Sequence, residues 1–333
     1  MVQNLIGGKK LILVYHTFTG GSDRVGQDKY YSPQGAIPVD RLRSHLRWLS
    51  EFAEFVTLDE ILRSSKTTGW KVAVTLDDGY RNNISLAFPI FEKLKVPVTW
   101  FVSPKFVEND LLPWWDLVDF TARVAQPALT IQTRYSRYSF DLSGEQDRAC
   151  FRLQCRRWFQ NSDPDVARCV RHQIENSIPD DLPRNAFASR QEIVEASRSP
   201  LVSLGGHTVS HPNLARLSAS DIRYEVSEGR KQLEVWTDES IRWFAYPYGE
   251  HEHWDKRTKR IVREEGFDGA VTTVRAYADQ RADQFEVPRL TVPNSRSQWK
   301  TKAWILATNT CREIYRLKQS LVERTPSWCE GDT

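Results

Sequence analysis

Short apolar runs rich in β-branched and aromatic residues alternate with amphipathic stretches along much of the chain. In the first part of the sequence these runs are Leu11–Tyr15, Val72–Leu76 and Val98–Val102. Such alternation is typical of repeated βα units arranged around a mainly parallel sheet. The pattern therefore predicts an α/β fold in which these runs are buried strands.

The stretches between the strands have the periodicity of helices. Residues 40–52 and 83–94 each repeat apolar residues on one helical face. Thr57 and Glu60 have the spacing of a capping box, which predicts that another helix begins there. The first hundred residues therefore contain several βα units.

The alternation stops near residue 112 and resumes near residue 199. The second half predicts strands at 201–206, 241–246, 268–272 and 286–292, and helices from Ser218 towards Trp236 and over 254–265. We expect four parts: a first barrel segment at 1–111, an insertion at 112–198 that is helical in its middle, a second barrel segment at 199–298, and a C-terminal helix and tail at 299–333.

The amphipathic segment 299–323 predicts a closing helix. Its apolar residues favour packing on the core, although contact with a membrane surface stays open as an alternative.

Composition is that of an ordinary globular protein, with 40% hydrophobic and 27% charged residues among 333. A formal net charge of +3 from 46 basic and 43 acidic residues is too small to indicate a nucleic-acid partner. The basic excess lies in one stretch, because residues 121–173 contain nine arginines and five acids. That stretch suits a phosphate or uronate on a substrate, an anionic membrane, or simply a solvated helix surface.

The cysteines and the N-terminal residues bear on the compartment. The five cysteines are an odd number and include no CxxC pair, which argues against a full disulfide framework and against a cysteine zinc site. The first apolar run is too short for a signal peptide or a membrane span. We expect a cytoplasmic protein, with association at the inner membrane surface left open. The oligomeric state is not indicated.

Two acidic residues follow the buried run at 72–76. Asp77 and Asp78 stand at the predicted end of the strand, and Gly79 permits a sharp turn. At the C-terminal end of a barrel strand, both carboxylates can point into an active-site mouth. The alternative is an exposed Asp-Asp-Gly turn.

His207 and His211 are four positions apart, and Gly205 and Gly206 precede them while Pro212 follows. Pro212 disfavours helical geometry at His211, so we expect a strand-to-loop turn that brings both imidazoles to one metal. Two histidines and one carboxylate form a common zinc triad that leaves a position open for water, and the second carboxylate can act as a base. Two unrelated surface histidines are the alternative.

Three segments in this order resemble the motifs of the polysaccharide deacetylase family, also called the NodB-homology family or carbohydrate esterase family 4. They are Thr75–Gly79, His207–His211 and Phe244–Gly249, and the segment Tyr15–Phe18 is also similar. The resemblance implies a distorted (β/α) barrel of the NodB-homology type. It covers roughly residues 10–110 and 200–295.

The resemblance also implies roles for particular residues. Asp77 would be the general base, and Asp78, His207 and His211 would hold one divalent metal ion. Tyr248 would donate its backbone N–H to the oxyanion. Zinc is the metal expected first, while cobalt, nickel and iron accept the same ligands.

Two departures from the family pattern affect the mechanism. Many members have an arginine that orients the catalytic aspartate, whereas this chain has Ala245 at that position. Arg289, just past a predicted strand, is our hypothesis for the substitute, with an exposed ion pair as the alternative. The late histidine that serves as general acid in the family has no obvious counterpart. His16 is the candidate, with a supporting hydrogen-bonded role as the alternative.

Substrate contacts are expected from Tyr246 and Pro247 of the third motif and from Trp115 in the insertion, unless the pair Trp114–Trp115 only packs internally.

The resulting functional hypothesis is a hydrolase that removes N-acetyl groups from amino sugars of a polysaccharide, oligosaccharide or glycan precursor. One alternative is a deacylase or deformylase acting on another small or lipid-linked amide. Another is a saccharide-binding member of the fold that has no activity.

Overall fold

The structure, a computed structural model, describes residues 8–20, 36–63, 67–109, 112–125, 128–178, 186–278, 283–295 and 297–306. The chain divides into two compact units. The first comprises Met1–Leu111 and Asn185–Thr308, and the second comprises Leu112–Arg184 and Asn309–Thr333.

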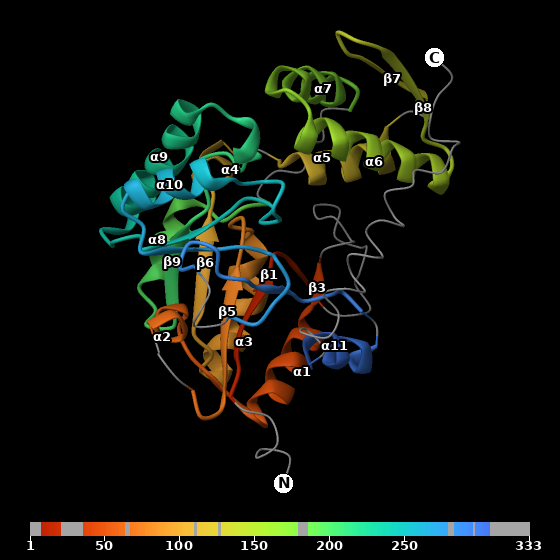
Figure 1. The fold of residues 1–333 in the computed structure, drawn as a ribbon. Coiled ribbons are helices and arrows are strands. Elements are labelled where there is room, and N and C mark those ends of the chain that lie inside the picture. The colour runs from red at the N-terminus through yellow and green to blue at the C-terminus, as the bar shows by residue number, and fades with distance from the viewer. Residues whose placement is uncertain are drawn as a thin grey trace. The chain divides into compact units, whose positions relative to one another are not determined.

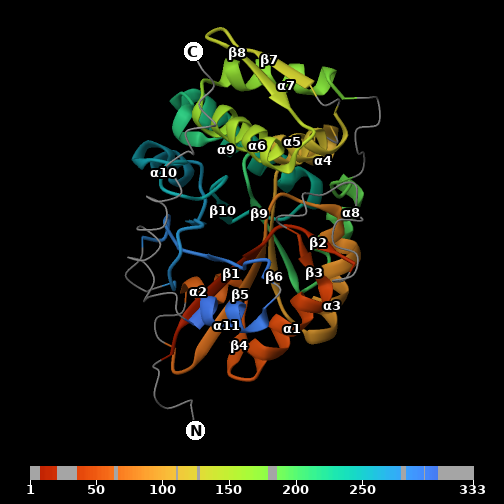
Figure 2. The ribbon, with the colours of Figure 1, turned by 90° about the vertical axis from the view of Figure 1, so that its right-hand side faces the viewer.

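An eight-stranded parallel sheet forms the centre of the first unit (Figure 1 and Figure 2). Seven strands follow the order β11-β10-β9-β6-β5-β1-β12, and β4 pairs beside the start of β5. The strands are β1 Lys10–Tyr15, β4 Ala53–Phe55, β5 Trp70–Leu76, β6 Val98–Val102, β9 Val202–Gly206, β10 Trp243–Ala245, β11 Gly269–Val271 and β12 Leu290–Thr291. The two short strands β2 Phe18–Thr19 and β3 Ile37–Pro38 pair separately. This parallel half-barrel confirms the predicted α/β fold.

Helices pack around the sheet of this unit. They are α1 Val39–Ser50, α2 Leu58–Arg63, the π-helix η2 Asn83–Ala87, α3 Phe88–Leu94, α4 Pro104–Asn109, α8 Arg190–Ser197, the 3₁₀ helix η3 Leu214–Arg216, α9 Ala219–Thr237, α10 Lys256–Glu264 and α11 Gln298–Leu306. The predicted capping box is present, since Thr57 and Glu60 exchange side-chain-to-backbone bonds of 2.8 and 3.1 Å. Ser218 caps α9 by accepting a hydrogen bond from the backbone N–H of Asp221.

Strands β1 and β6 are buried along their whole length, as in parallel sheets whose two faces are both covered. The register aligns Tyr15 with Leu76 and Leu76 with Trp100. The residues that follow these strands therefore meet at one edge of the sheet, which is where the candidate catalytic residues were expected.

The second unit contains the helices α5 Trp114–Val124, α6 Glu145–Asn161 and α7 Pro164–Asn176, together with a hairpin of β7 Ala128–Gln132 and β8 Arg137–Asp141. Helix α6 corresponds to the helix expected near residues 150–160. The hairpin was not predicted. Alternate residues Leu129 and Ile131 of β7 are buried, and Phe140 of β8 packs edge-on against Phe151 of α6. An antiparallel pair with one apolar face thus packs on a helix.

The observed boundaries differ from the expected ones in two places. Helix α8, which was assigned to the insertion, belongs to the first unit and packs against α9 and β9. The closing helix is described only as α11, and the rest of the expected segment 299–323 lies outside the described residues. Within the described part of the chain, no helix combines the length and the apolar character needed to cross a lipid bilayer.

Candidate active site

The acidic pair lies where β5 ends. The backbone N–H of Asp77 donates to the carbonyl of Tyr15 at 3.1 Å and so continues the parallel ladder for one residue. Asp78 and Gly79 then adopt positive φ angles of 76° and 97°, which turn the chain away from the sheet. Both aspartates are only 2% exposed, so the alternative of a solvent-exposed turn is wrong.

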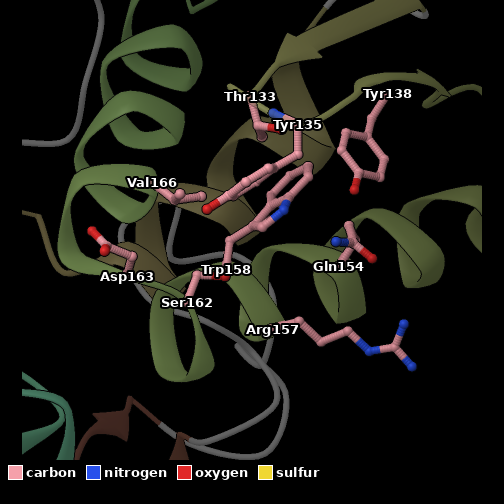
Figure 3. Close-up of a pocket in the computed structure, with 9 residues that line it drawn as sticks. All are labelled: Thr133, Tyr135, Tyr138, Gln154, Arg157, Trp158, Ser162, Asp163 and Val166. Carbon is pink, nitrogen blue, oxygen red and sulfur yellow. Dashed lines mark hydrogen bonds between the residues drawn. The ribbon is translucent and has the colours of Figure 1, made fainter.

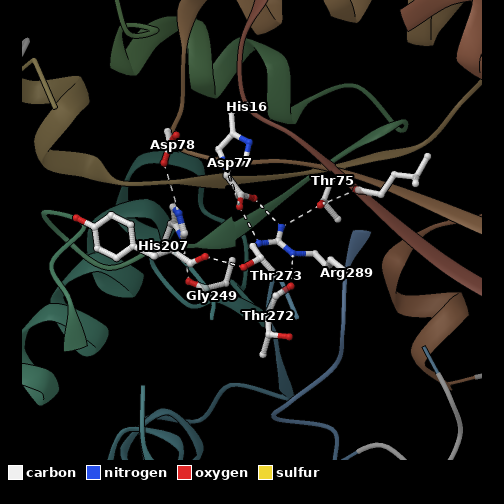
Figure 4. Close-up of polar contacts among 12 residues, drawn as sticks. His16, Thr75, Asp77, Asp78, His207, Gly249, Thr272, Thr273 and Arg289 are labelled. Carbon is white, nitrogen blue, oxygen red and sulfur yellow. Dashed lines mark hydrogen bonds and ion pairs between the residues drawn. The ribbon is translucent and has the colours of Figure 1, made fainter. Parts of the chain in front are cut away.

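Arg289, just before β12, binds both oxygens of the Asp77 carboxylate. Its Nη1 and Nη2 atoms donate hydrogen bonds of 2.7 Å to Oδ1 and Oδ2, and the side chain of Arg289 is fully buried. Figure 4 shows the guanidinium facing Asp77, with His16 on another side of the carboxylate. Because a guanidinium fork matches a carboxylate in geometry, this pair fixes the orientation of Asp77.

The remaining donors of Arg289 are bonded as well. Its Nε atom donates to the carbonyl of Thr272 at 3.1 Å, and Nη1 also donates to the Thr75 hydroxyl at 2.9 Å. Burial would raise the pKa of Asp77, but the charges of Arg289 and His207 and the hydrogen bonds from Arg289 bring it below its usual range. Asp77 is therefore ionised at neutral pH.

Asp78, His207 and His211 gather beside Asp77 in a buried group. Oδ1 of Asp78 lies 3.5 Å from Nε2 of each histidine, and the candidate ligand atoms all lie within 4.8 Å of one another. That oxygen is buried without a hydrogen-bond partner among the described residues. Two imidazoles, one carboxylate and an unsatisfied oxygen fit a metal ion, so this group could hold one.

The two imidazoles are prepared for this role in different ways. Nδ1 of His207 lies 2.7 Å from the carbonyl of Ala245, which favours a proton on Nδ1 and leaves Nε2 to face Asp78. Burial, together with the neighbouring His207, lowers the pKa of His211 to about 3. Burial raises the pKa of Asp78, but the neighbouring imidazoles of His207 and His211 lower it to about 2. Asp78 is therefore a carboxylate and His211 a neutral imidazole at neutral pH.

The loop between the two histidines is held by Glu225 of α9. Its carboxylate accepts hydrogen bonds of 2.9 Å from the backbone N–H groups of Val209 and Ser210, and one of 2.6 Å from the Ser210 hydroxyl. Thr208 and His211 both have positive φ, at 65° and 58°. Sequence reasoning missed Glu225, because nothing in a helical pattern marks a glutamate that serves a distant loop.

His16 follows β1 and lies close to the acidic pair. Its Nε2 atom is 3.9 Å from Oδ2 of Asp77, and its side chain is 38% exposed. The buried side chain of Asn83 donates to the carbonyl of His16 at 2.8 Å, and Asn82 donates to Thr17 and Phe18. The two asparagines at the start of the π-helix, also missed from the sequence, therefore anchor the segment that carries His16.

Tyr248 lies on a tight turn beside His211. Its ring meets that of His211 edge-on with centroids 4.6 Å apart, and its φ is 61°. The hydroxyl of Thr273 donates to the Tyr248 carbonyl at 2.6 Å, and the backbone N–H of Thr273 donates to Gly249 at 3.1 Å (Figure 4). The turn expected to supply an N–H group thus lies beside the candidate metal ligands. Thr273, two residues beyond the end of β11, holds this turn in place.

The expected substrate contacts of the third motif are not supported. The ring of Tyr246 is fully buried, stacks on Trp254, and donates its hydroxyl to the carbonyl of Phe285 at 3.0 Å. Pro247 is also buried, and its carbonyl accepts from Gly249 within the turn. Both residues therefore belong to the interior.

Trp115 belongs to the second unit and is half-buried. It meets Trp114 edge-on at 5.6 Å, while Trp114 stacks on Phe159 of α6 at 5.2 Å. The pair packs at least partly within that unit, and contact of Trp115 with a substrate stays a prediction.

Solved structures with similar folds include proteins described as deacetylases. The Streptococcus pyogenes deacetylase PplD, solved with acetate, is 15% identical, with a TM-score of 0.57 over 91% of this chain and 100% of the other. IcaB from Ammonifex degensii is 20% identical, with a TM-score of 0.56 over 90% and 97%. The de-N-acetylase from Aggregatibacter actinomycetemcomitans is 15% identical, with a TM-score of 0.57 over 88% and 98%. At these identities the likeness shows the fold alone.

The sequence comparisons reach less of the chain. No curated protein matches it. The family model described as polysaccharide deacetylase matches residues 164–270, a stretch that includes His207, His211 and Tyr248. This match, together with the three motifs that meet at one edge of the sheet, shows that part of the chain is similar to the polysaccharide deacetylase family.

Proposed function

We propose that the chain is a metal-dependent hydrolase that removes N-acetyl groups from amino sugars of a polysaccharide, oligosaccharide or glycan precursor. The observation that carries this proposal is the Asp77 carboxylate, fixed by Arg289 next to the buried group of Asp78, His207 and His211. A site that only bound a saccharide would not require an oriented base beside a complete set of metal ligands.

Asp78, His207 and His211 would hold one divalent metal ion, for which zinc is our first choice and cobalt, nickel or iron are alternatives. When bound, such an ion polarises the amide carbonyl and makes water more acidic. The ligand donors belong to two short segments, one after β5 and one after β9, that the sheet brings together, so the site forms only in the folded chain.

Asp77 acts as the general base in this proposal. Its depressed pKa keeps the carboxylate ionised, and the fork of Arg289 holds it in one orientation for accepting a proton from the attacking water. Arg289 supplies the orienting charge that Ala245 cannot. The substitution at the family's usual arginine position therefore does not argue against activity.

Two further groups complete the proposed reaction. The backbone N–H of Tyr248 stabilises the negative charge that develops on the amide oxygen. His16 donates a proton to the departing amine, because its imidazole is partly exposed and near Asp77. The products are acetate and a free amino sugar.

The test is product release from matched substrates. Zinc-reconstituted protein is given N-acetylglucosamine oligomers and, in parallel, the corresponding N-formyl sugars, and acetate and formate are quantified. The proposal predicts acetate release that a chelator abolishes. Release of formate alone would move the assignment to a deformylase, and saccharide binding without any release would indicate a non-catalytic member of the family.

A further inference from the structure

The second unit contains a pocket of about 310 Å³ that the proposed reaction does not use (Figure 3). The hairpin β7–β8 contributes Tyr135 and Tyr138, and helix α6 with its C-terminal end contributes Gln154, Arg157, Trp158 and Ser162. The volume is at the lower end of the range for small-molecule sites. It suits one sugar ring.

The walls of this pocket are set by secondary structure. Gln154, Arg157 and Trp158 are spaced at i, i+3 and i+4 on α6, so they share one helical face. Tyr138 is paired with Ile131 across the hairpin, and its ring meets Trp158 edge-on at 4.9 Å. Trp158 is only 4% exposed and forms the floor. The aromatic and polar groups are therefore positioned before any ligand arrives.

The polar groups of the pocket are largely uncommitted. Within the described part of the chain, no hydrogen bond or ion pair engages the amide of Gln154, the hydroxyl of Tyr138 or the guanidinium of Arg157. Asp163 also lines the pocket, but its carboxylate already has partners. One oxygen caps α7 by accepting from the backbone N–H of Asp165, and the other lies 3.4 Å from the guanidinium of Arg134. The available chemistry is thus hydroxyl, amide and one positive charge.

Tyr135 gives the pocket an exposed aromatic wall. Its side chain is 73% exposed at the turn of the hairpin, and Figure 3 shows its ring beside that of Trp158. A sugar ring has an apolar face of C–H groups and a rim of hydroxyls, so it matches a tyrosine ring flanked by hydroxyl and amide groups. Arg157 favours a carboxylate on the sugar.

We propose that this pocket is a saccharide-binding site of the insertion, separate from the residues of the candidate active site, with a preference for acidic sugars. Tyr135 and Tyr138 contact the ring, Gln154 and Ser162 bond its hydroxyls, and Arg157 pairs with its carboxylate. The site would let the protein hold a glycan by units other than the one being hydrolysed, and it does not depend on the proposed activity.

Calorimetric titration tests the proposal on the full metal-bound chain in an Asp77→Asn background, so that the metal is kept and turnover is slow. The probes are hyaluronan oligosaccharides, which contain a uronate, and neutral N-acetylglucosamine oligomers. We expect Tyr135→Ala to weaken binding of both probes about tenfold, and Arg157→Gln to weaken only the hyaluronan probe. Tyr224→Ala is the matched control, since this tyrosine of α9 is 59% exposed and does not line the pocket.

Equal affinities for the parent, Tyr135→Ala and Tyr224→Ala proteins, or no binding of either probe, would overturn the proposal. Vesicles containing anionic lipid are titrated in parallel. Binding of vesicles that is lost in Tyr135→Ala, without saccharide binding by the parent, would instead make the hairpin a membrane contact and would also overturn it. Circular dichroism of each variant verifies that the exposed substitutions leave the fold intact.

Discussion

Arg289 and Asp77 lie 212 positions apart in the sequence, yet their side chains form two hydrogen bonds of 2.7 Å in the interior of the protein. The guanidinium comes from the segment before β12, while Ala245 stands at the end of β10 where many family members have arginine. The backbone carbonyl of Ala245 lies 2.7 Å from Nδ1 of His207 and fixes that imidazole. Arg289, which orients Asp77, and Ala245, which supports His207, thus belong to different segments of the chain.

Replacing Arg289 tests its role as the orienting residue. Arg289→Met leaves Asp77 buried without its counter-charge, so we expect a loss of about 3–5 kcal/mol in stability and about a 10²-fold loss in kcat. The measurements are thermal unfolding and the pH profile of kcat/KM. Arg289→Lys keeps the positive charge but lacks the two parallel N–H groups of the guanidinium. We therefore expect it to restore more of the thermal stability than of kcat, relative to Arg289→Met.

The pH dependence supplies a second readout for the same pair. The folded-state pKa of Asp77 is depressed, so its stabilising contribution is present above the unfolded value of about 3.9 and is lost as pH falls through the folded pKa. In Arg289→Met, burial dominates and the pKa rises, so the acidic limb of the kcat/KM profile moves to higher pH. An unmoved limb would mean that Arg289 does not control the ionisation of Asp77.

Glu225 is expected to govern metal affinity without touching the metal. Glu225→Ala removes three hydrogen bonds from the loop at Val209 and Ser210. Supporting groups of this kind typically contribute 10- to 100-fold in metal affinity, and we expect a loss of about that size. Competition with a chromophoric chelator measures it. Glu239→Gln, an exposed change beyond the end of α9, serves as control, and equal metal affinities of the two variants would contradict the account.

For the substitution Gly229→Ala in α9, helix propensity and packing predict opposite changes in stability. Gly→Ala within a helix normally adds about 1 kcal/mol of stability. A Cβ at position 229, however, would lie 2.8 Å from the carbonyl carbon and 2.9 Å from the oxygen of Thr208. We therefore expect Gly229→Ala to lower the melting temperature and weaken the metal site. Gly69→Ala, where the added carbon meets nothing within 4 Å, is the control. A more stable Gly229→Ala protein would show that the loop can move freely.

Metal removal should destabilise the fold as well as stop the reaction. At a free metal concentration of a hundred times Kd, binding contributes about 2.7 kcal/mol to stability. We expect a chelator to lower the Tm of the parent and to leave that of Asp78→Asn unchanged. Differential scanning calorimetry of both proteins, with and without zinc, makes the comparison. A parent Tm that is insensitive to zinc would argue against this ligand group.

The parts of the fold that local sequence determines were predictable. The apolar run Leu11–Tyr15 and the caps at Thr57 and Ser218 depend on neighbouring residues alone, and the structure contains them as expected. The β7–β8 hairpin was missed because its alternation of buried and exposed residues is short and lies among many arginines.

Only the residues of the site that lie in recognisable motifs could be predicted from the sequence. The grouping of Asp78, His207 and His211 followed from residue type and strand ends. The left-handed backbone at Asp78, Thr208 and His211 was not predictable, because only a few per cent of non-glycine residues adopt it. The expected substrate contact of Tyr246 was wrong for a related reason. The sequence of the motif does not show whether the tyrosine ring faces the substrate or the core, and the ring is buried.

The measurement that bears most directly on the central claim compares the parent with Asp77→Asn. Both proteins are reconstituted with zinc, their metal content is determined, and acetate release from N-acetylglucosamine oligomers is followed. The account predicts equal metal content and a rate lower by about 10²- to 10⁴-fold in Asp77→Asn. Equal rates, or no acetate from a fully metallated parent, would contradict the assignment of Asp77 as the base of a sugar deacetylase.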